Sequence, residues 1–130
     1  DFQFNGQAIS SYFGEFQDYD YVLPNGQTAE LKRDNNAANT HNVAVEISRK
    51  SKGEQIPSGL SVSKADLYYF LIPNTDHRHY LYSIETERIK KLTPRLKTVA
   101  CNGGRTFCRL LPVDELSFIG YFTDSFLGVK

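Results

Sequence analysis

The sequence predicts an α/β fold, a single domain with a central mixed β-sheet flanked by helices. Three observations favour this class. Residues 18–33 alternate polar and apolar side chains around a Pro-Asn-Gly turn, as in a β-hairpin. Residues 67–73 form a continuous apolar run that is typical of a buried strand. Residues 7–16 and 85–92 repeat apolar side chains at helical spacing.

Length and composition agree with one domain over residues 1–130. The chain is 40% hydrophobic and contains nine Phe and eight Tyr, enough to fill a core. No repeat or linker divides it. No apolar run approaches the ~20 residues that a membrane-spanning helix needs, and no segment resembles a signal peptide. We therefore expect a cytoplasmic protein.

The predicted elements follow one another with short connections. They are a helix over 7–16, strands over 18–23, 28–33 and 42–48, a basic loop over 49–59, a helical turn over 61–66, strands over 67–73 and 79–84, a helix over 85–92, a hairpin of 96–101 with 105–111, and a helix that begins in 112–120. Asn5 is the expected cap of the first helix. Residues 34–41 are rich in Asn, which favours a loop or a short helical turn.

The boundaries are predicted from Gly, Pro and Asn. Pro24-Asn25-Gly26 closes the first hairpin, and Asn102-Gly103-Gly104 closes the last one. Thr93-Pro94 stops the helix before that hairpin. Ser61 or Ser63 is expected to cap the helical turn. Pro112, near the first turn, favours a helix after it.

Polar side chains share one face of the first three predicted strands. Glu30 and Lys32 are two residues apart, so they point to the same side, roughly 7 Å apart along the strand. Asp20 lies on the preceding strand of the hairpin, and Glu46 lies on the polar side of the third strand. If these strands are neighbours, their carboxylates converge.

Converging carboxylates repel one another and favour a bound cation. Hard oxygen ligands prefer Mg²⁺ or Mn²⁺, which can promote phosphodiester hydrolysis, while a nearby lysine can orient the attacking water. The predicted catalytic residues are Asp20, Glu30 and Lys32, and the predicted metal ligands are Asp20, Glu30 and Glu46. Asp18 and Asp34 share the same parity and are further candidates. Acids and a lysine paired on a solvent-exposed strand are the alternative interpretation.

These residues resemble a known signature. Asp20 and Glu30-Leu31-Lys32 resemble the motif of the PD-(D/E)XK nuclease superfamily. Later segments resemble its small phage-type and bacterial members over about residues 18–73: Thr40-His41-Asn42, Val45-Glu46, Ser58-Gly59-Leu60 and Lys64-Ala65-Asp66. Two positions depart from the pattern, because Asp20 is not preceded by Pro and His41 stands where Gly is expected.

The resemblance implies a restriction-endonuclease-like core: a helix, a three-stranded antiparallel meander, a helix and a further strand. It also implies a Mg²⁺- or Mn²⁺-dependent deoxyribonuclease, more often an endonuclease than an exonuclease, in the cytoplasm of a bacterial or phage-infected cell. In many relatives a Glu from the first helix joins the site, and Glu15 is the candidate here. Cleavage of both DNA strands by so small a domain would favour a homodimer.

Basic residues near the predicted site are candidates for DNA binding. They are Arg49, Lys50, Lys52 and Lys64, together with Ser58 as a hydroxyl donor. A solvated turn is the alternative for the basic loop, as a solvated helix face is for the basic residues of 88–97. A nuclease fold without activity that still binds nucleic acid is the main functional alternative. Cys101 and Cys108 are interpreted as buried thiols, although a hairpin could pair them.

Overall fold

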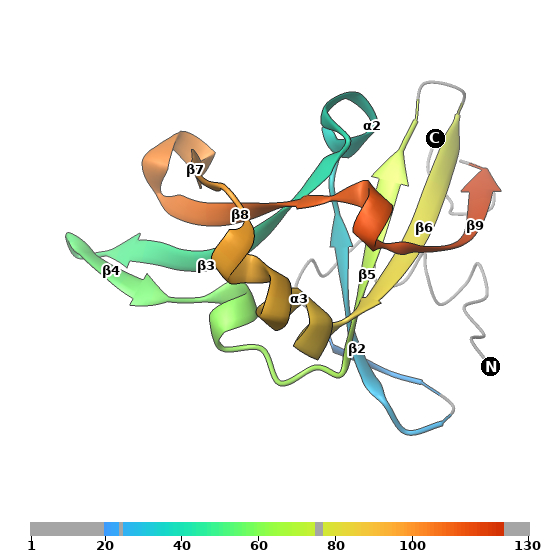
Figure 1. Cartoon of the computed structure of the whole chain (residues 1–130), viewed down its shortest axis with the longest axis horizontal. Helices are drawn as coiled ribbons and strands as arrows, with labels where there is room; N and C mark the ends of the chain where they lie inside the picture. The colour runs from blue at the N-terminus through green and yellow to red at the C-terminus, as the bar shows by residue number, and fades with distance from the viewer. Residues whose placement is uncertain (1–19, 24, 75–76, 124–130) are drawn as a thin grey trace.

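The computed structural model describes residues 20–23, 25–74 and 77–123 of the chain (Figure 1). The predicted helix over 7–16, with Glu15, and the candidate ligand Asp18 lie outside the described residues. For Asp20 the backbone alone is described.

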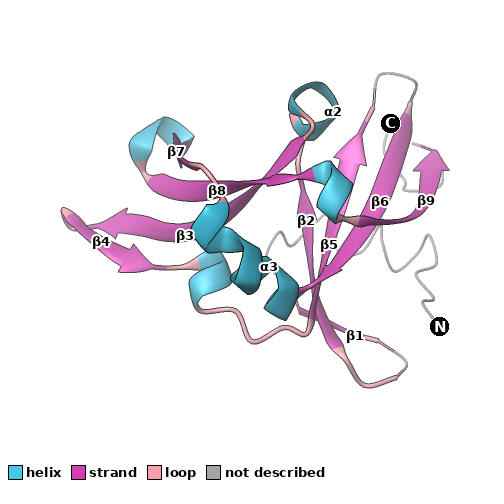
Figure 2. Cartoon of the chain, in the orientation of Figure 1, coloured by secondary structure: helices cyan, strands magenta, loops and turns pink. Residues whose placement is uncertain are grey.

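Two β-sheets make up most of the described chain (Figures 1 and 2). Sheet A contains, in spatial order, β1 (Asp20–Val22), β2 (Thr28–Arg33), β5 (Leu67–Pro73), β6 (Arg78–Glu85) and β9 (Ser117–Thr123). Sheet B contains β4 (Glu54–Pro57), β3 (Asn42–Ser51), β8 (Thr106–Pro112) and β7 (Thr98–Cys101). Sheet B extends away from sheet A as a separate wing in both figures.

Helices are few and short in the described residues. They are α2 (Ala37–Thr40), α3 (Thr86–Leu92) and the 3₁₀ turns η1 (Gly59–Ser61), η2 (Thr93–Arg95), η3 (Asn102–Gly104) and η4 (Val113–Glu115). The expected α/β class, with helices flanking a central sheet, is therefore wrong, because the fold is mostly β. None of the described helices is long and apolar enough to cross a membrane.

Two segments explain much of this difference. The predicted basic loop over 49–59 is a hairpin, because β3 continues to Ser51 and β4 returns from a turn at Lys52-Gly53. Both turn residues have positive φ, which is the geometry of tight hairpin turns. The segment that begins at Pro112 is not a helix beyond η4, since its aromatic and β-branched residues pair as β9 with β6. The predictions for β2, β5 and α3 are confirmed.

The expected three-stranded meander is also wrong. β1 and β2 form the predicted antiparallel hairpin, with Asp20 opposite Glu30. However, β3 pairs with β4 and β8 in sheet B, and the next neighbour of β2 is the parallel strand β5. The connection from β2 to β5 therefore runs through the β3–β4 hairpin and the 3₁₀ turn η1, in place of the expected helix.

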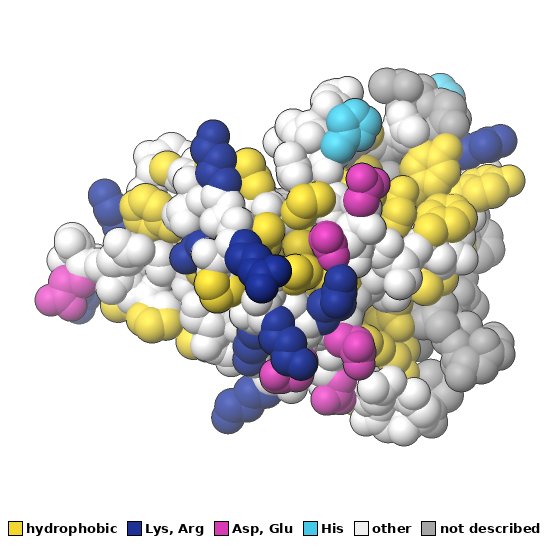
Figure 3. Space-filling view, in the orientation of Figure 1, with side chains coloured by type: hydrophobic (Ala, Val, Ile, Leu, Met, Phe, Trp, Pro, Cys, Tyr) yellow, Lys and Arg dark blue, Asp and Glu magenta, His cyan; other side chains and the backbone are white. Residues whose placement is uncertain are grey.

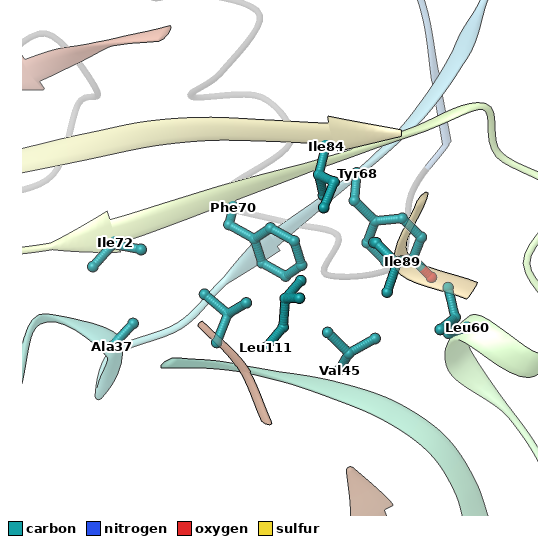
Figure 4. Close-up of a cluster of buried hydrophobic side chains, with 10 residues drawn as sticks. Ala37, Val45, Leu60, Tyr68, Phe70, Ile72, Ile84, Ile89 and Leu111 are labelled. Atoms are coloured by element: carbon teal, nitrogen blue, oxygen red, sulfur yellow. The ribbon is translucent and has the colours of Figure 1, made fainter. Parts of the chain in front are cut away.

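The core lies where the two sheets meet (Figure 4). Tyr68 and Phe70 of β5 face Val45 of β3 and Leu111 of β8, and Ile89 of α3 closes one side. All five side chains are almost completely buried. The burial of these apolar side chains joins the two sheets, and close packing keeps the junction between them rigid.

His41 ends α2 with a left-handed backbone, at φ 61° and ψ 20°. This conformation is costly for residues with a Cβ atom and is the usual place for glycine after a helix. The backbone therefore gives a physical reason why glycine is expected here and shows that histidine can occupy the same turn.

Candidate active site

A pocket of about 1090 Å³ opens between the two sheets. Glu30 and Lys32 reach it from β2, and Glu46 and Arg49 reach it from β3. Lys64 lines it from the segment between η1 and β5. The structure thus brings together the predicted Glu-x-Lys pair and the predicted third carboxylate, although their strands belong to different sheets.

The alternation of β2 places Glu30 and Lys32. Ala29 and Leu31 are buried on the other face of the strand, so the two polar side chains turn toward the pocket. The Lys32 ammonium lies 3.7 Å from Oε2 of Glu30. Ser63 donates a hydrogen bond of 2.5 Å to the other carboxylate oxygen, Oε1.

Glu46 reaches the pocket from sheet B at an irregular point of β3. The register with β8 shifts between Glu46 and Ser48, which marks a β-bulge that re-aims the strand. Ser58 donates a 2.7 Å hydrogen bond to Oε2 of Glu46. Each glutamate of the pocket is therefore held by a serine from the segment that surrounds η1.

Burial shapes the charge of Lys32. Desolvation lowers the pKa of its ammonium, and the negative charge of Glu46 opposes part of that change. The carboxylates of Glu30 and Glu46 and the ammonium of Lys32 thus share a partly dehydrated region of the pocket.

The remaining predicted ligands have different positions. Asp20 pairs with Glu30 in the register of β1 and β2. Asp34 lines the pocket, but its two oxygens accept hydrogen bonds from the backbone N–H groups of Asn36 and Ala44, at 3.0 and 2.9 Å. Asp34 therefore braces the loop that leads into β3. The described residues contain no group of three or more acidic, His or Cys side chains arranged to hold a metal.

The predicted nucleic-acid contacts divide into three kinds. Arg49 and Lys64 line the pocket and are exposed. Lys50 places its ammonium 5.9 Å from the ring centre of Phe107, and Lys52 lies in the turn of the β3–β4 hairpin. Ser58 is buried and bonded to Glu46, which makes it a partner of a carboxylate and not an open phosphate donor.

Sequence reasoning gave Ser63 no role at this site. Its contact with Glu30 joins residues that are 33 positions apart, and no local pattern encodes such a pair. From the sequence alone, Ser63 is a candidate cap for the helical turn that follows Ser58-Gly59-Leu60. Its contact with Glu30 becomes visible only in the folded structure.

Charge is unevenly distributed along this neutral chain. Residues 42–57 and 93–112, which contain sheet B, hold seven basic and two acidic residues, a formal net charge of +5. The acidic pair is Glu46 and Glu54. In Figure 3 many of the Lys and Arg side chains lie over the sheet B wing and the adjoining α3. A polyanion would be attracted to this part of the molecule.

Cys101 and Cys108 also line the pocket and are free thiols. Burial, together with the neighbouring Cys101 thiol, raises the pKa of Cys108 to about 12. The interpretation as a buried thiol is confirmed for Cys108, whereas Cys101 is half-buried.

We compared the chain with protein families, curated proteins and solved structures. No family model, no curated protein and no solved structure matches this chain. The resemblance to PD-(D/E)XK nucleases therefore depends on the residues of the motif alone.

Proposed function

We propose that this protein hydrolyses DNA phosphodiester bonds with the help of Mg²⁺ or Mn²⁺. One observation carries the proposal: Glu30, Lys32 and Glu46 line a single pocket together with the exposed cations of Arg49 and Lys64. Carboxylates that hold a metal ion, an ammonium and phosphate-binding cations are together sufficient for phosphodiester hydrolysis. The proposal depends on these side chains and not on the expected fold, which is absent.

The donor chemistry of the pocket fits a small divalent cation. Mg²⁺ is commonly held by one or two carboxylates, with water and substrate phosphate completing its coordination. Glu30 and Glu46 would supply the two carboxylates, and Asp20 is proposed as a third ligand from the strand beside β2. A bound cation would supply Lewis-acid activation of the water and of the phosphoryl oxygen.

The chain's own residues would perform the other tasks. Arg49 and Lys64 would bind phosphates that flank the scissile bond. The Lys32 ammonium would orient the attacking water or stabilise the charge that develops on the phosphorane. The basic sheet B wing would attract the DNA backbone without reading its sequence.

A plasmid-nicking assay tests the proposal. Supercoiled DNA should be cleaved with Mg²⁺ or Mn²⁺ and left intact with a chelator. Glu46→Gln should reduce the rate by ~100-fold or more. Glu54→Gln is the matched control, because Glu54 is an exposed glutamate of the same sheet that does not line the pocket.

The same measurements distinguish the alternatives. If the protein binds DNA at low salt but cleaves neither duplex, single-stranded nor branched substrates, it is a nucleic-acid-binding module without catalysis. The +5 charge of the sheet B segments favours that second function. Absence of both binding and cleavage would exclude both and leave an interaction protein with surface ion pairs.

A further inference from the structure

The polar base of the pocket contains two serines whose hydroxyls contact different glutamates. Ser58 precedes η1 and Ser63 follows it, so both belong to one six-residue segment. Ser58 donates to Glu46 of sheet B, and Ser63 donates to Glu30 of sheet A. This short segment therefore links the two sheets through their carboxylates.

Both hydroxyls are well enclosed. The residues are 7% and 9% exposed, respectively, so solvent has little access to replace either hydrogen bond. A bond of this kind restricts the torsion angles of a long glutamate side chain. A hydroxyl carries no charge, so it fixes the carboxylate without cancelling the negative charge that attracts a cation.

Close packing holds the segment in place. Gly59 has φ +55°, and a Cβ atom built there would lie 2.3 Å from the backbone oxygen of Glu46. The segment thus lies directly against β3 at the residue whose carboxylate Ser58 contacts. Ser61 adds a 2.7 Å hydrogen bond to the backbone oxygen of Ile47 but touches no carboxylate.

We infer that Ser58 and Ser63 are positioning residues, which fix the carboxylates of Glu46 and Glu30 in one relative orientation for a shared divalent cation. The inference rests on the proposed function for the cation, while the fixed orientation follows from the contacts alone. Residues that orient metal ligands in this way commonly change metal affinity by about 10–100-fold when they are removed.

Side-chain NMR of the metal-free protein tests the orientation directly. With ¹³C-labelled glutamate, Ser63→Ala should increase the motion of the Glu30 side chain toward that of the exposed Glu54. Ser58→Ala should do the same to Glu46 alone. Ser61→Ala is the matched control on the same segment and should leave both carboxylates ordered. Ser58→Cys and Ser63→Cys, which keep the size but weaken the donor, should repeat the results if an alanine variant folds poorly.

Binding of Mn²⁺, followed by the electron spin resonance signal of the free ion, tests the link to the cation. Ser58→Ala and Ser63→Ala should weaken binding by about 10-fold or more, and Ser61→Ala should not. Unchanged glutamate motion in the serine variants would overturn the inference, as would an equal effect of Ser61→Ala. Loosened glutamates in a protein that never binds Mn²⁺ would instead reject the proposed function and leave the positioning role intact.

Discussion

Lys32 is the residue on which the proposed chemistry depends most directly. Its ammonium lies close to Glu30 and experiences the charge of Glu46, yet burial disfavours its protonated form. The charge of the lysine is therefore set by burial and by these two carboxylates together. Its alternation with Leu31 keeps it away from the core face of β2.

Lys32→Ala should abolish cleavage and leave the fold intact. We expect a rate loss of ~100-fold or more, because a preorganised charge that stabilises the transition state is removed. The free energy of unfolding should change by less than about 1 kcal/mol. Plasmid nicking and a thermal melt measure the two quantities, and Lys91→Ala, on the exposed face of α3, is the control. A wild-type rate would remove Lys32 from the mechanism.

Cys108 should make stability sensitive to alkaline pH. Its pKa rises from 9.0 to about 12 on folding, so the folded state favours the neutral thiol. This contribution is complete below pH 9.0 and is lost as pH rises toward 12, because the unfolded chain ionises first. In Cys108→Ala, the free energy of unfolding should fall less steeply as pH rises. The slope should be smaller by up to about 1 kcal/mol per pH unit. Urea titrations at several pH values measure this slope, and Cys101→Ala should keep the part of the decline that burial causes and lose the part that the Cys101 thiol adds.

The orientation of individual side chains was predicted well where it follows from local spacing. Glu30 and Lys32 point to one side because β2 alternates, and that pattern is visible in six residues of sequence. Glu46 reaches the same pocket through a β-bulge and a second sheet, which local spacing does not encode. The hydroxyl partners Ser58 and Ser63 depend on long-range packing, so neither contact was predictable.

At the scale of elements, the 3₁₀ turn η1 takes the place of the helix expected between the third and fourth core strands. Residues 112–120, predicted to begin a helix, form only the short 3₁₀ turn η4 before the chain enters β9. Polar segments such as the β3–β4 hairpin formed strands because β8 supplied a pairing edge for β3. Tertiary pairing of this kind overrides local preference, which explains why β4 and β9 were not predicted as strands.

Gly59→Ala tests how tightly η1 docks on β3. The left-handed backbone alone should cost about 1–2 kcal/mol, and the clash with Glu46 should add about 1–3 kcal/mol. Gly53→Ala is the matched control, since Gly53 also has positive φ but has no atom within 4 Å of the added Cβ. Chemical denaturation should show a clearly larger loss for Gly59→Ala. Equal losses would mean that the segment can move away from β3 at little cost.

At the scale of the whole molecule, a neutral chain carries a basic wing. The sheet B segments hold a formal +5 charge, although total Lys and Arg equal total Asp and Glu. The net charge of the whole chain therefore conceals a strongly basic region. The order of the strands within the sheets could not be predicted either. β2 pairs in parallel with β5, and the whole β3–β4 hairpin lies between them in the sequence.

The affinity for DNA should fall as the salt concentration rises. The steepness of this fall should depend on the basic residues of the sheet B wing. Replacing Lys50 and Lys52 together by Gln should weaken binding on every sequence and reduce the slope of log affinity against log salt by about 2. Arg78→Gln, which removes a positive charge from β6 of sheet A, is the control and should leave the slope unchanged. Fluorescence anisotropy with labelled duplex at several salt concentrations measures both slopes. A larger effect per charge for Arg78→Gln would place the DNA elsewhere.

The chain alternates between the two sheets, with β1 and β2 in one, β3 and β4 in the other, β5 and β6 back in the first, β7 and β8 in the second, and β9 in the first. No single cut separates one sheet from the other. Neither sheet can be completed before distant segments meet, so the contact order is high and folding should be slow for so short a chain. The glutamates from β2 and β3 would then come together only as the whole assembly forms, and a protease that nicks either hairpin of sheet B should release no active fragment.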